Sequence, residues 1–278
     1  MTEKCITVAA ALLLATTAGA AFAQNMPTSQ PPLILIAREY VKLGHGADHE
    51  RIEAGWPAEF AKDKSQTYYL AMVSLTGASE AWFVVPYASH AAIANDMRLM
   101  ASDTALGAEL GRLGRADADM LTDARQIEAV ARPDLSSSAF PDLGRQRFWE
   151  ISVYRVRPGH SAEFDAAAKA YGAANQRTSP GRSYRIYQVT AGMPAPTYII
   201  FESFVNYAQI DSTMATGQKT MQGLTPDEQT AMTKFFSDGL LSSETNRFQL
   251  SATMSYVPDS VRATDPSFWM PKPRARRP

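Results

Sequence analysis

The chain contains an imperfect internal repeat, and this feature restricts its fold more than any other. Residues 39–45 and 154–160 both end in Gly-His, at an offset of 154 − 39 = 115. The same offset places Gly77 on Gly192. Matches that keep their order and nearly constant spacing indicate tandem copies of one structural unit of roughly 110 residues. We therefore predict two similar halves.

Both halves have the same predicted order of elements. Apolar and β-branched runs that end at turn residues predict strands, and apolar residues at helical spacing predict helices. The expected elements are a strand (33–42 and 148–157), a helix (47–62 and 161–175), two strands (68–75 with 81–85, and 184–190 with 197–201), a helical region (89–121 and 207–241) and a last strand (126–131 and 248–257). This order, β-α-β-β-α-β, is that of the ferredoxin-like split βαβ unit.

A short motif in the second half carries a family resemblance. Residues 149–160, Trp-Glu-Ile-Ser-Val-Tyr-Arg-Val-Arg-Pro-Gly-His, are followed by Glu163-Phe164 and resemble the opening of dimeric α+β-barrel proteins. Among these the motif is most similar to the NIPSNAP-like and antibiotic-biosynthesis-monooxygenase-like groups. Residues 38–45 are a looser copy in which Leu43 replaces the proline.

The resemblance implies an architecture. In that superfamily two four-stranded sheets pair face to face, usually from two chains. We therefore expect an α+β fold in which two tandem ferredoxin-like β-α-β-β-α-β repeats pair their antiparallel sheets into an intramolecular dimeric α/β barrel.

The N-terminus has the pattern of a secretory signal peptide. Lys4 precedes an apolar run that ends in the small-residue motif Ala21-Phe22-Ala23. We predict cleavage near Ala23-Gln24, and a periplasmic or secreted mature protein. The only cysteine, Cys5, lies in this leader, which excludes disulfides, thiolate metal sites and thiol catalysis from the mature chain.

The rest of the chain is divided by composition. We predict an N-terminal extension (24–32), a first repeat (33–135), a Ser- and Pro-containing linker (136–146), a second repeat (147–260) and a Pro/Arg-rich tail (261–278). Prolines and basic residues predict that the tail is extended or disordered from Pro266 onward. Contact of the basic end with an anionic envelope polymer or lipid is a minor alternative.

Charge and motifs exclude several function classes. With 27 basic and 28 acidic residues the net charge is −1, so we expect no nucleic-acid partner. No segment after the leader has 18 uninterrupted apolar residues, so we expect no integral membrane segment after cleavage. The sequence lacks a G-x-S-x-G elbow, a phosphate-binding glycine loop and an H-E-x-x-H helix. We predict no cofactor, and further homo-oligomerisation stays open.

Alternation along the strand 148–157 locates a candidate site. Glu150, Ser152 and Tyr154 share one face, and Ile151 and Val153 share the other. We expect the apolar residues to pack on the helices. The polar residues should then face the space between the two sheets, where relatives in the resembled superfamily hold their ligands.

Four residues outside this strand complete the predicted site. Glu39 is the counterpart of Tyr154, Trp82 and Tyr198 are interpreted as equivalent positions, and Glu202 lies on the same side as Tyr198. The predicted ligand-binding residues are Glu39, Trp82, Glu150, Ser152, Tyr154, Tyr198 and Glu202. Aromatic walls with a few acidic groups suit a small, partly aromatic molecule. In the alternative interpretation these residues simply fill the core between the sheets.

The histidines suggest turn structure more than chemistry. His45 and His160 follow a glycine at equivalent strand-to-helix turns, where we expect the rings to hydrogen-bond exposed backbone at the helix start. His45, His49 and Glu53 are spaced at i, i+4 and i+8, which would place three metal ligands on one helix face. Gly46 argues against a helix that includes His45. We therefore predict no metal site.

Two function classes follow from these observations. In the first, the exported protein binds a small, partly aromatic molecule without transforming it. In the second, it is a cofactor-independent monooxygenase or isomerase, with Glu39 or Glu150 as acid/base and Tyr154 as hydrogen-bond donor. The first is favoured, because Glu39 aligns with Tyr154 and no acid/base set recurs in both halves. The resemblance assigns no catalytic residue to this chain.

Overall fold

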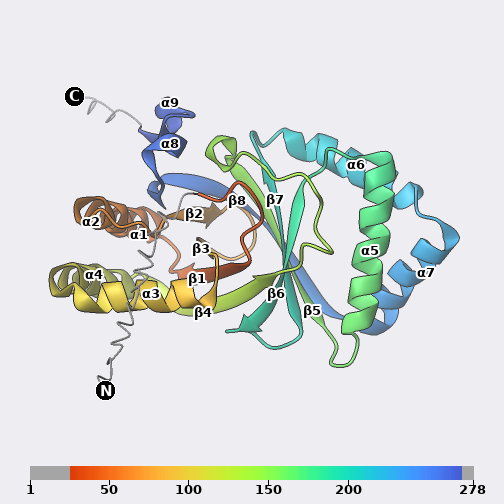
Figure 1. Ribbon diagram of the computed structural model, residues 1–278, viewed down its shortest axis with the longest axis horizontal. Coiled ribbons are helices and arrows are strands. Elements are labelled where there is room, and N and C mark those ends of the chain that lie inside the picture. Colours follow the sequence, from red (N-terminus) through yellow and green to blue (C-terminus); the bar gives the residue numbers. More distant parts are fainter. Residues whose placement is uncertain (1–25, 271–278) are drawn as a thin grey trace, which may run out of the picture.

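Eight strands close into a single antiparallel barrel (Figure 1). The computed structural model describes residues 26–270, so the predicted signal peptide and residues 271–278 of the tail lie outside the described residues. The strands are β1 (Leu33–Val41), β2 (Tyr69–Ser74), β3 (Glu80–Tyr87), β4 (Leu121–Ala131), β5 (Phe148–Val156), β6 (Tyr184–Ala191), β7 (Thr197–Phe204) and β8 (Leu240–Tyr256). Their order around the barrel is β1-β3-β2-β8-β5-β7-β6-β4.

Each half of the chain contributes four adjacent strands to this barrel. The first half supplies β4-β1-β3-β2 and the second supplies β8-β5-β7-β6, so the two sheets have the same internal order. Antiparallel pairs β2–β8 and β4–β6 join the sheets at their edges. This confirms the predicted α+β fold and the pairing of two sheets within one chain.

Helices cover the outside of the barrel in two groups (Figure 1). On the first sheet lie α1 (Gly46–Glu53), α2 (Gly55–Asp63), α3 (His90–Ser102) and α4 (Thr104–Ala118). On the second sheet lie α5 (Ser161–Thr178), α6 (Gln209–Gln222) and α7 (Pro226–Lys234), followed by the short π-helical turn η2 (Phe235–Gly239). Among residues 26–270, no helix is both long and apolar enough to cross a membrane.

Capping side chains divide the long helical regions expected from the sequence. Asp103 ends α3 and begins α4, because its Oδ1 accepts a hydrogen bond from the Leu106 backbone N–H at 2.8 Å. Thr225 begins α7 with a reciprocal capping box to Glu228. The predicted region 89–121 therefore contains two helices, and the region 207–241 contains α6, α7 and the π-helical turn η2.

Large apolar side chains fill the inside of the barrel. Trp82 is almost fully buried there, with its ring 5.7 Å from Phe248 and 6.4 Å from Phe201. Ile151 and Val153 belong to the same interior cluster. The interior is therefore a packed core, as expected for a barrel of this size.

This packing overturns the predicted orientation of β5. Ile151 and Val153 point into the barrel, whereas Glu150, Ser152 and Tyr154 point towards the helices. The prediction was wrong because the barrel interior, closed on all sides by strands, is the driest part of the fold. The most apolar face of each strand is therefore turned inward, and the helix layer receives the mixed face.

The beginning of the tail is folded. The short helices α8 (Asp259–Arg262) and α9 (Pro266–Trp269) follow β8, and Trp269 is buried. Its indole N–H donates to the Gly144 carbonyl at 2.9 Å, in the 3₁₀ turn η1 (Leu143–Arg145). Arg147 pairs with Asp265 at 2.6 Å. The prediction of an extended segment from Pro266 was therefore wrong up to Trp269. Burial of the Trp269 side chain stabilises this segment in a folded form despite its prolines.

The interior packing predicts a large stability difference between two positions of β8. Phe248 is fully buried and Leu241 is 47% exposed. Phe248→Ala should lower the free energy of unfolding by about 3–5 kcal/mol, because it leaves a cavity beside Trp82. Leu241→Ala should change it by less than about 1 kcal/mol. Denaturant unfolding of both variants tests this, and similar losses would contradict the assignment of Phe248 to the barrel core.

Candidate functional site

A cavity of about 350 Å³ lies between the second sheet and its helices. Strands β5, β6, β7 and β8 form its floor, and α5, α7 and η2 contribute to its walls. Its polar lining residues are Glu150, Ser152, Tyr154, Arg182, Glu202 and Thr245. Its aromatic lining residues are Tyr154, Phe164, Tyr171, Tyr184, Phe235 and Phe236. The cavity thus combines aromatic walls with a limited set of polar groups.

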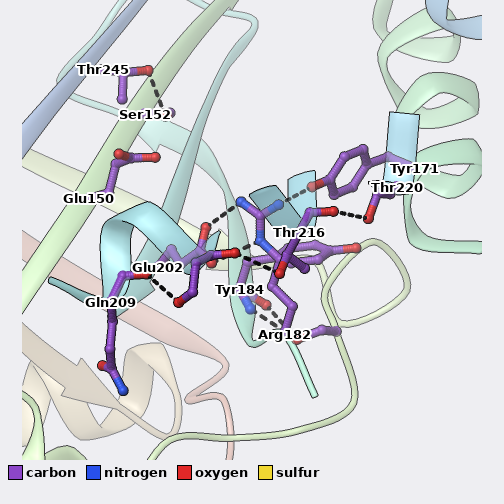
Figure 2. A network of polar contacts seen from close by, with 12 residues as sticks. Glu150, Ser152, Tyr171, Arg182, Tyr184, Glu202, Gln209, Thr216, Thr220 and Thr245 are labelled. Carbon is purple, nitrogen blue, oxygen red and sulfur yellow. Dashed lines mark hydrogen bonds and ion pairs between the residues drawn. The ribbon is translucent and has the colours of Figure 1, made fainter. Parts of the chain in front are cut away.

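Arg182 organises one polar side of this cavity (Figure 2). Its guanidinium donates two hydrogen bonds to the Glu202 carboxylate, at 2.8 and 2.6 Å, and a third to the Tyr171 hydroxyl. Burial raises the pKa of Glu202, and the adjacent Arg182 opposes that shift. Arg182 and Glu202 neutralise each other through this bidentate contact. The pair therefore forms part of the cavity wall and leaves no unpaired charge for a ligand.

The strand β5 supplies the second polar side. Glu150 accepts a hydrogen bond from Arg247 at 3.2 Å, and Ser152 shares one with Thr245 at 2.8 Å. Burial is the main cause that raises the pKa of the Tyr154 phenol, and Glu150 adds to it. Tyr154 therefore stays protonated, and its hydroxyl has no hydrogen-bond partner among residues 26–270. It is available as a donor to a ligand.

The structure brings together four of the seven residues predicted to bind a ligand. Glu150, Ser152, Tyr154 and Glu202 all line the cavity. Tyr198 lies below it, stacked on Phe164 with ring centroids 3.8 Å apart. The other two, Trp82 and Glu39, lie in the barrel interior and in the first half, respectively. The cavity lies under helices, so the predicted location between the sheets was wrong.

The equivalence of Trp82 and Tyr198 was also wrong. Arg38 on β1 pairs with Trp82, and Val153 on β5, at 38 + 115, pairs with Ile199. Trp82 therefore corresponds to Ile199, one residue away from the predicted partner. A shift of one residue in a strand moves a side chain to the opposite face, which is why Trp82 is inside the barrel and Tyr198 is not.

His45 and His160 occupy the predicted positions, immediately before α1 and α5, but their rings make no capping hydrogen bond. The turns are closed by backbone hydrogen bonds instead, from the N–H groups of both histidines to carbonyls three residues earlier, each at 3.0 Å. Gly44 and Gly159 make these turns possible at φ values of +86° and +89°. The expected role of the rings was therefore wrong.

The first half contains a cluster of four titratable side chains at the place where the second half has its cavity. Glu39 from β1, His49 and Glu53 from α1, and Asp117 from α4 bring their ligand-type atoms within 4.8 Å of one another. We call these four residues the charged cluster. His49 Nε2 is 3.0 Å from Glu39 Oε2 and 3.6 Å from Asp117 Oδ1.

Burial and mutual repulsion perturb this cluster strongly. Burial raises the pKa of Glu53 to about 9, and the neighbouring Glu39 and Asp117 carboxylates add to the shift. Burial, then Glu39, raises the pKa of Asp117 to about 6, while His49 opposes it. Of the groups that shift these two values, only His49 can carry a positive charge. These residues are the candidates for holding a metal ion.

The two sites occupy equivalent positions. At the offset of 115, Glu39, His49 and Glu53 correspond to Tyr154, Phe164 and Ala168, all of which line the cavity. The same backbone framework thus holds a charged cluster in one half and an aromatic cavity in the other.

Two residues that matter here were missed in the sequence. Asp117 continues the buried stripe Leu106, Leu110 and Leu113 along α4, so a carboxylate at a core position was the available signal. Arg182 lies in the loop before β6, and no local pattern links it to Glu202. Their pairing depends on strands β6 and β7 lying side by side.

Comparison with known proteins adds support for the fold. No family matches the chain by sequence profile, and no curated protein matches it in sequence. A protein provisionally named a monooxygenase from Lactobacillus acidophilus has 10% identity and a TM-score of 0.50, over 80% of this chain and 94% of that one. An anthrone oxidase-like protein has 12% identity and a TM-score of 0.52, over 81% of this chain and 93% of that one. A chlorite dismutase variant from Candidatus Nitrospira defluvii has 11% identity and a TM-score of 0.50, over 85% of this chain and 96% of that one.

These likenesses concern the fold, because identities this low do not carry residue roles. They agree with the α+β barrel architecture expected from the sequence.

The charged cluster predicts a pH-dependent stability. The folded state keeps a proton on Glu53 up to about pH 9, whereas the unfolded state releases it near the ordinary value of 4.5. Stability should therefore fall as pH rises between these values, by up to about 1.4 kcal/mol per unit. Glu53→Gln should flatten this slope, and Glu50→Gln, at an exposed position on the same helix, should not.

Denaturant unfolding at pH 5, 6.5 and 8, in the presence of a chelator, measures the slope. If Glu53→Gln keeps the slope of the unsubstituted protein, the assignment of the shift to Glu53 is wrong.

Proposed function

We propose that the protein binds a small, partly aromatic molecule in the cavity of its second half. The observation that carries this proposal is the unpaired Tyr154 hydroxyl beside Glu150 and Ser152, facing aromatic walls. A ligand that places its rings against Phe164 and Phe235 would bring a polar substituent to these three groups. Burial of aromatic surface would provide affinity, and the polar groups would fix orientation.

The size of the cavity supports this class of ligand. A volume of about 350 Å³ falls at the lower end of the range for small-molecule sites. It suits a compound of two or three fused rings better than a polymer or a dinucleotide. Because Glu202 already neutralises Arg182, the proposed ligand is neutral or carries a hydrogen-bonding group, and does not need a strong negative charge.

A second candidate function is cofactor-independent oxygenation at the same site. Glu150 could accept a proton from an acidic C–H of the bound molecule, and Tyr154 could donate a hydrogen bond to the resulting oxyanion. Glu150 and Tyr154 are four residues apart on β5, so strand alternation places both side chains on the face that forms the cavity floor. The fold similarity to an anthrone oxidase-like protein and to provisionally named monooxygenases favours this candidate.

We further propose that the leader 1–23 exports the protein to the periplasm or beyond, and that the two halves arose by duplication of a NIPSNAP-like unit. The matched spacing of their motifs and the equal strand order of their sheets support the second proposal.

Filling the cavity should abolish binding. Ala168 on α5 lines the cavity, and Ala173 on the same helix is exposed. Ala168→Phe should weaken binding of the aromatic probe 1-anilinonaphthalene-8-sulfonate at least about tenfold by occupying its space, and Ala173→Phe should leave it unchanged. Fluorescence titration measures both, with circular dichroism to check folding. Equal affinity in the two variants would place the probe elsewhere.

Anthrone distinguishes an enzyme from a binding protein. Its oxidation consumes one O₂ and yields anthraquinone and one water, so oxygen uptake follows the reaction. If the cavity catalyses it, Glu150→Gln should lower the rate about 100-fold through loss of the base, and Asp227→Asn, at an exposed site on α7, should not change it. Uptake no faster than in buffer, or equal in Glu150→Gln, would count against the second candidate while leaving ligand binding intact.

A further inference from the structure

The charged cluster of the first half supports an inference that is independent of the ligand cavity. We propose that Glu39, His49, Glu53 and Asp117 form a binding site for a divalent transition-metal ion, with Zn²⁺ and Mn²⁺ as the fitting ions.

The geometry of the four side chains matches a metal site. Two donor atoms bound to one ion at about 2.0–2.2 Å are at most about 4.4 Å apart. The four ligand atoms of the charged cluster lie within 4.8 Å of one another, and two of their separations are 3.0 and 3.6 Å. Small side-chain rotations therefore bring all four within bonding distance of one central ion.

An unpartnered oxygen points to a ligand in the same place. Asp117 is 4% exposed, and its Oδ1 has no hydrogen-bond donor within the described part of the chain. His49 Nε2 can donate only one proton, and it is closer to Glu39 than to Asp117. A buried carboxylate oxygen without a donor is unfavourable, and a cation beside it would remove that penalty.

The ion pairs of the cluster also leave room for a cation. Three carboxyl groups and one imidazole lie together, and within residues 26–270 no lysine or arginine forms an ion pair with any of the four. A divalent ion would offset most of the negative charge and would leave His49 neutral as a nitrogen ligand.

The donor set selects the kind of ion. Carboxylate oxygens accept Mg²⁺, Ca²⁺ and Mn²⁺, whereas an imidazole nitrogen favours transition metals. One nitrogen and three oxygens together favour Zn²⁺ or Mn²⁺ over Mg²⁺. No thiolate takes part, which disfavours soft ions such as Cu⁺.

The surrounding structure explains how such a site could be both rigid and accessible. His49 and Glu53 are one turn apart on α1, and Asp117 is held by the buried leucine stripe of α4. The Glu39 side chain retains 16% exposure, whereas those of His49 and Asp117 retain 3% and 5%. An ion would therefore enter past Glu39.

Titration calorimetry tests the site. The purified protein, treated with EDTA and dialysed, should bind one Zn²⁺ or one Mn²⁺ with a Kd in the micromolar range or below, and should bind Mg²⁺ at least about tenfold more weakly. Asp117→Asn keeps the side-chain shape and should weaken Zn²⁺ binding at least about tenfold, as should His49→Gln. Two exposed-site controls, His90→Gln and Glu50→Gln, should leave it unchanged.

X-ray absorption spectroscopy of the Zn²⁺-loaded protein keeps the test decisive if His49→Gln does not fold. The expected spectrum has a first shell of nitrogen and oxygen donors without sulfur, and outer-shell scattering from one imidazole, whose absence would overturn the proposal. The proposal is overturned if neither ion binds with a Kd below about 100 µM, if Asp117→Asn binds as the unsubstituted protein does, or if His90→Gln removes binding. None of these outcomes bears on probe binding in the second half.

Discussion

The packed interior of the barrel is the constraint on which the rest of the structure depends. Strand β8 pairs with β5 of its own sheet and with β2 of the other, so the two halves enclose one shared core. Trp82 from the first half packs against Phe201 and Phe248 from the second. Neither sheet could bury these side chains alone, so the halves are expected to fold as one unit. Because the interior is packed, the cavity of the second half lies between its sheet and its helices.

Equivalent positions under the two helix layers hold opposite chemistry. Where the second half has Tyr154, Phe164 and Ala168, the first half has Glu39, His49 and Glu53. The aromatic set leaves a cavity, whereas the charged set closes on itself through the 3.0 Å contact between His49 and Glu39. The barrel core is shared and restricts both halves, but each helix layer packs on its own sheet. That independence allows one half to change without disturbing the other.

The sequence predicted the fold better than the site, and particular residues show why. Element order and the 115-residue offset follow from local patterns, and they were sufficient for the strand order and for barrel closure. Strand alternation correctly grouped Glu150, Ser152 and Tyr154, but alternation cannot say which face is inside. That choice depends on the second sheet, which seals the interior. Asp117 and Arg182 enter their sites only through contacts between distant segments, so no local signal located them beside His49 and Glu202.

The cost of the charged cluster argues that it has a use. Burying carboxylates near one another opposes folding, and the raised pKa of Glu53, to about 9, expresses that penalty. The second half shows that this framework accepts Phe164 and Ala168 at the same positions, where they pack without any charge to desolvate. Aromatic or aliphatic residues in the first half would therefore stabilise the fold more. Buried polar groups that oppose stability are concentrated at functional sites, where a bound partner compensates for them. A cation held by the four side chains would supply that compensation, as Arg182 does for the buried Glu202 in the second half.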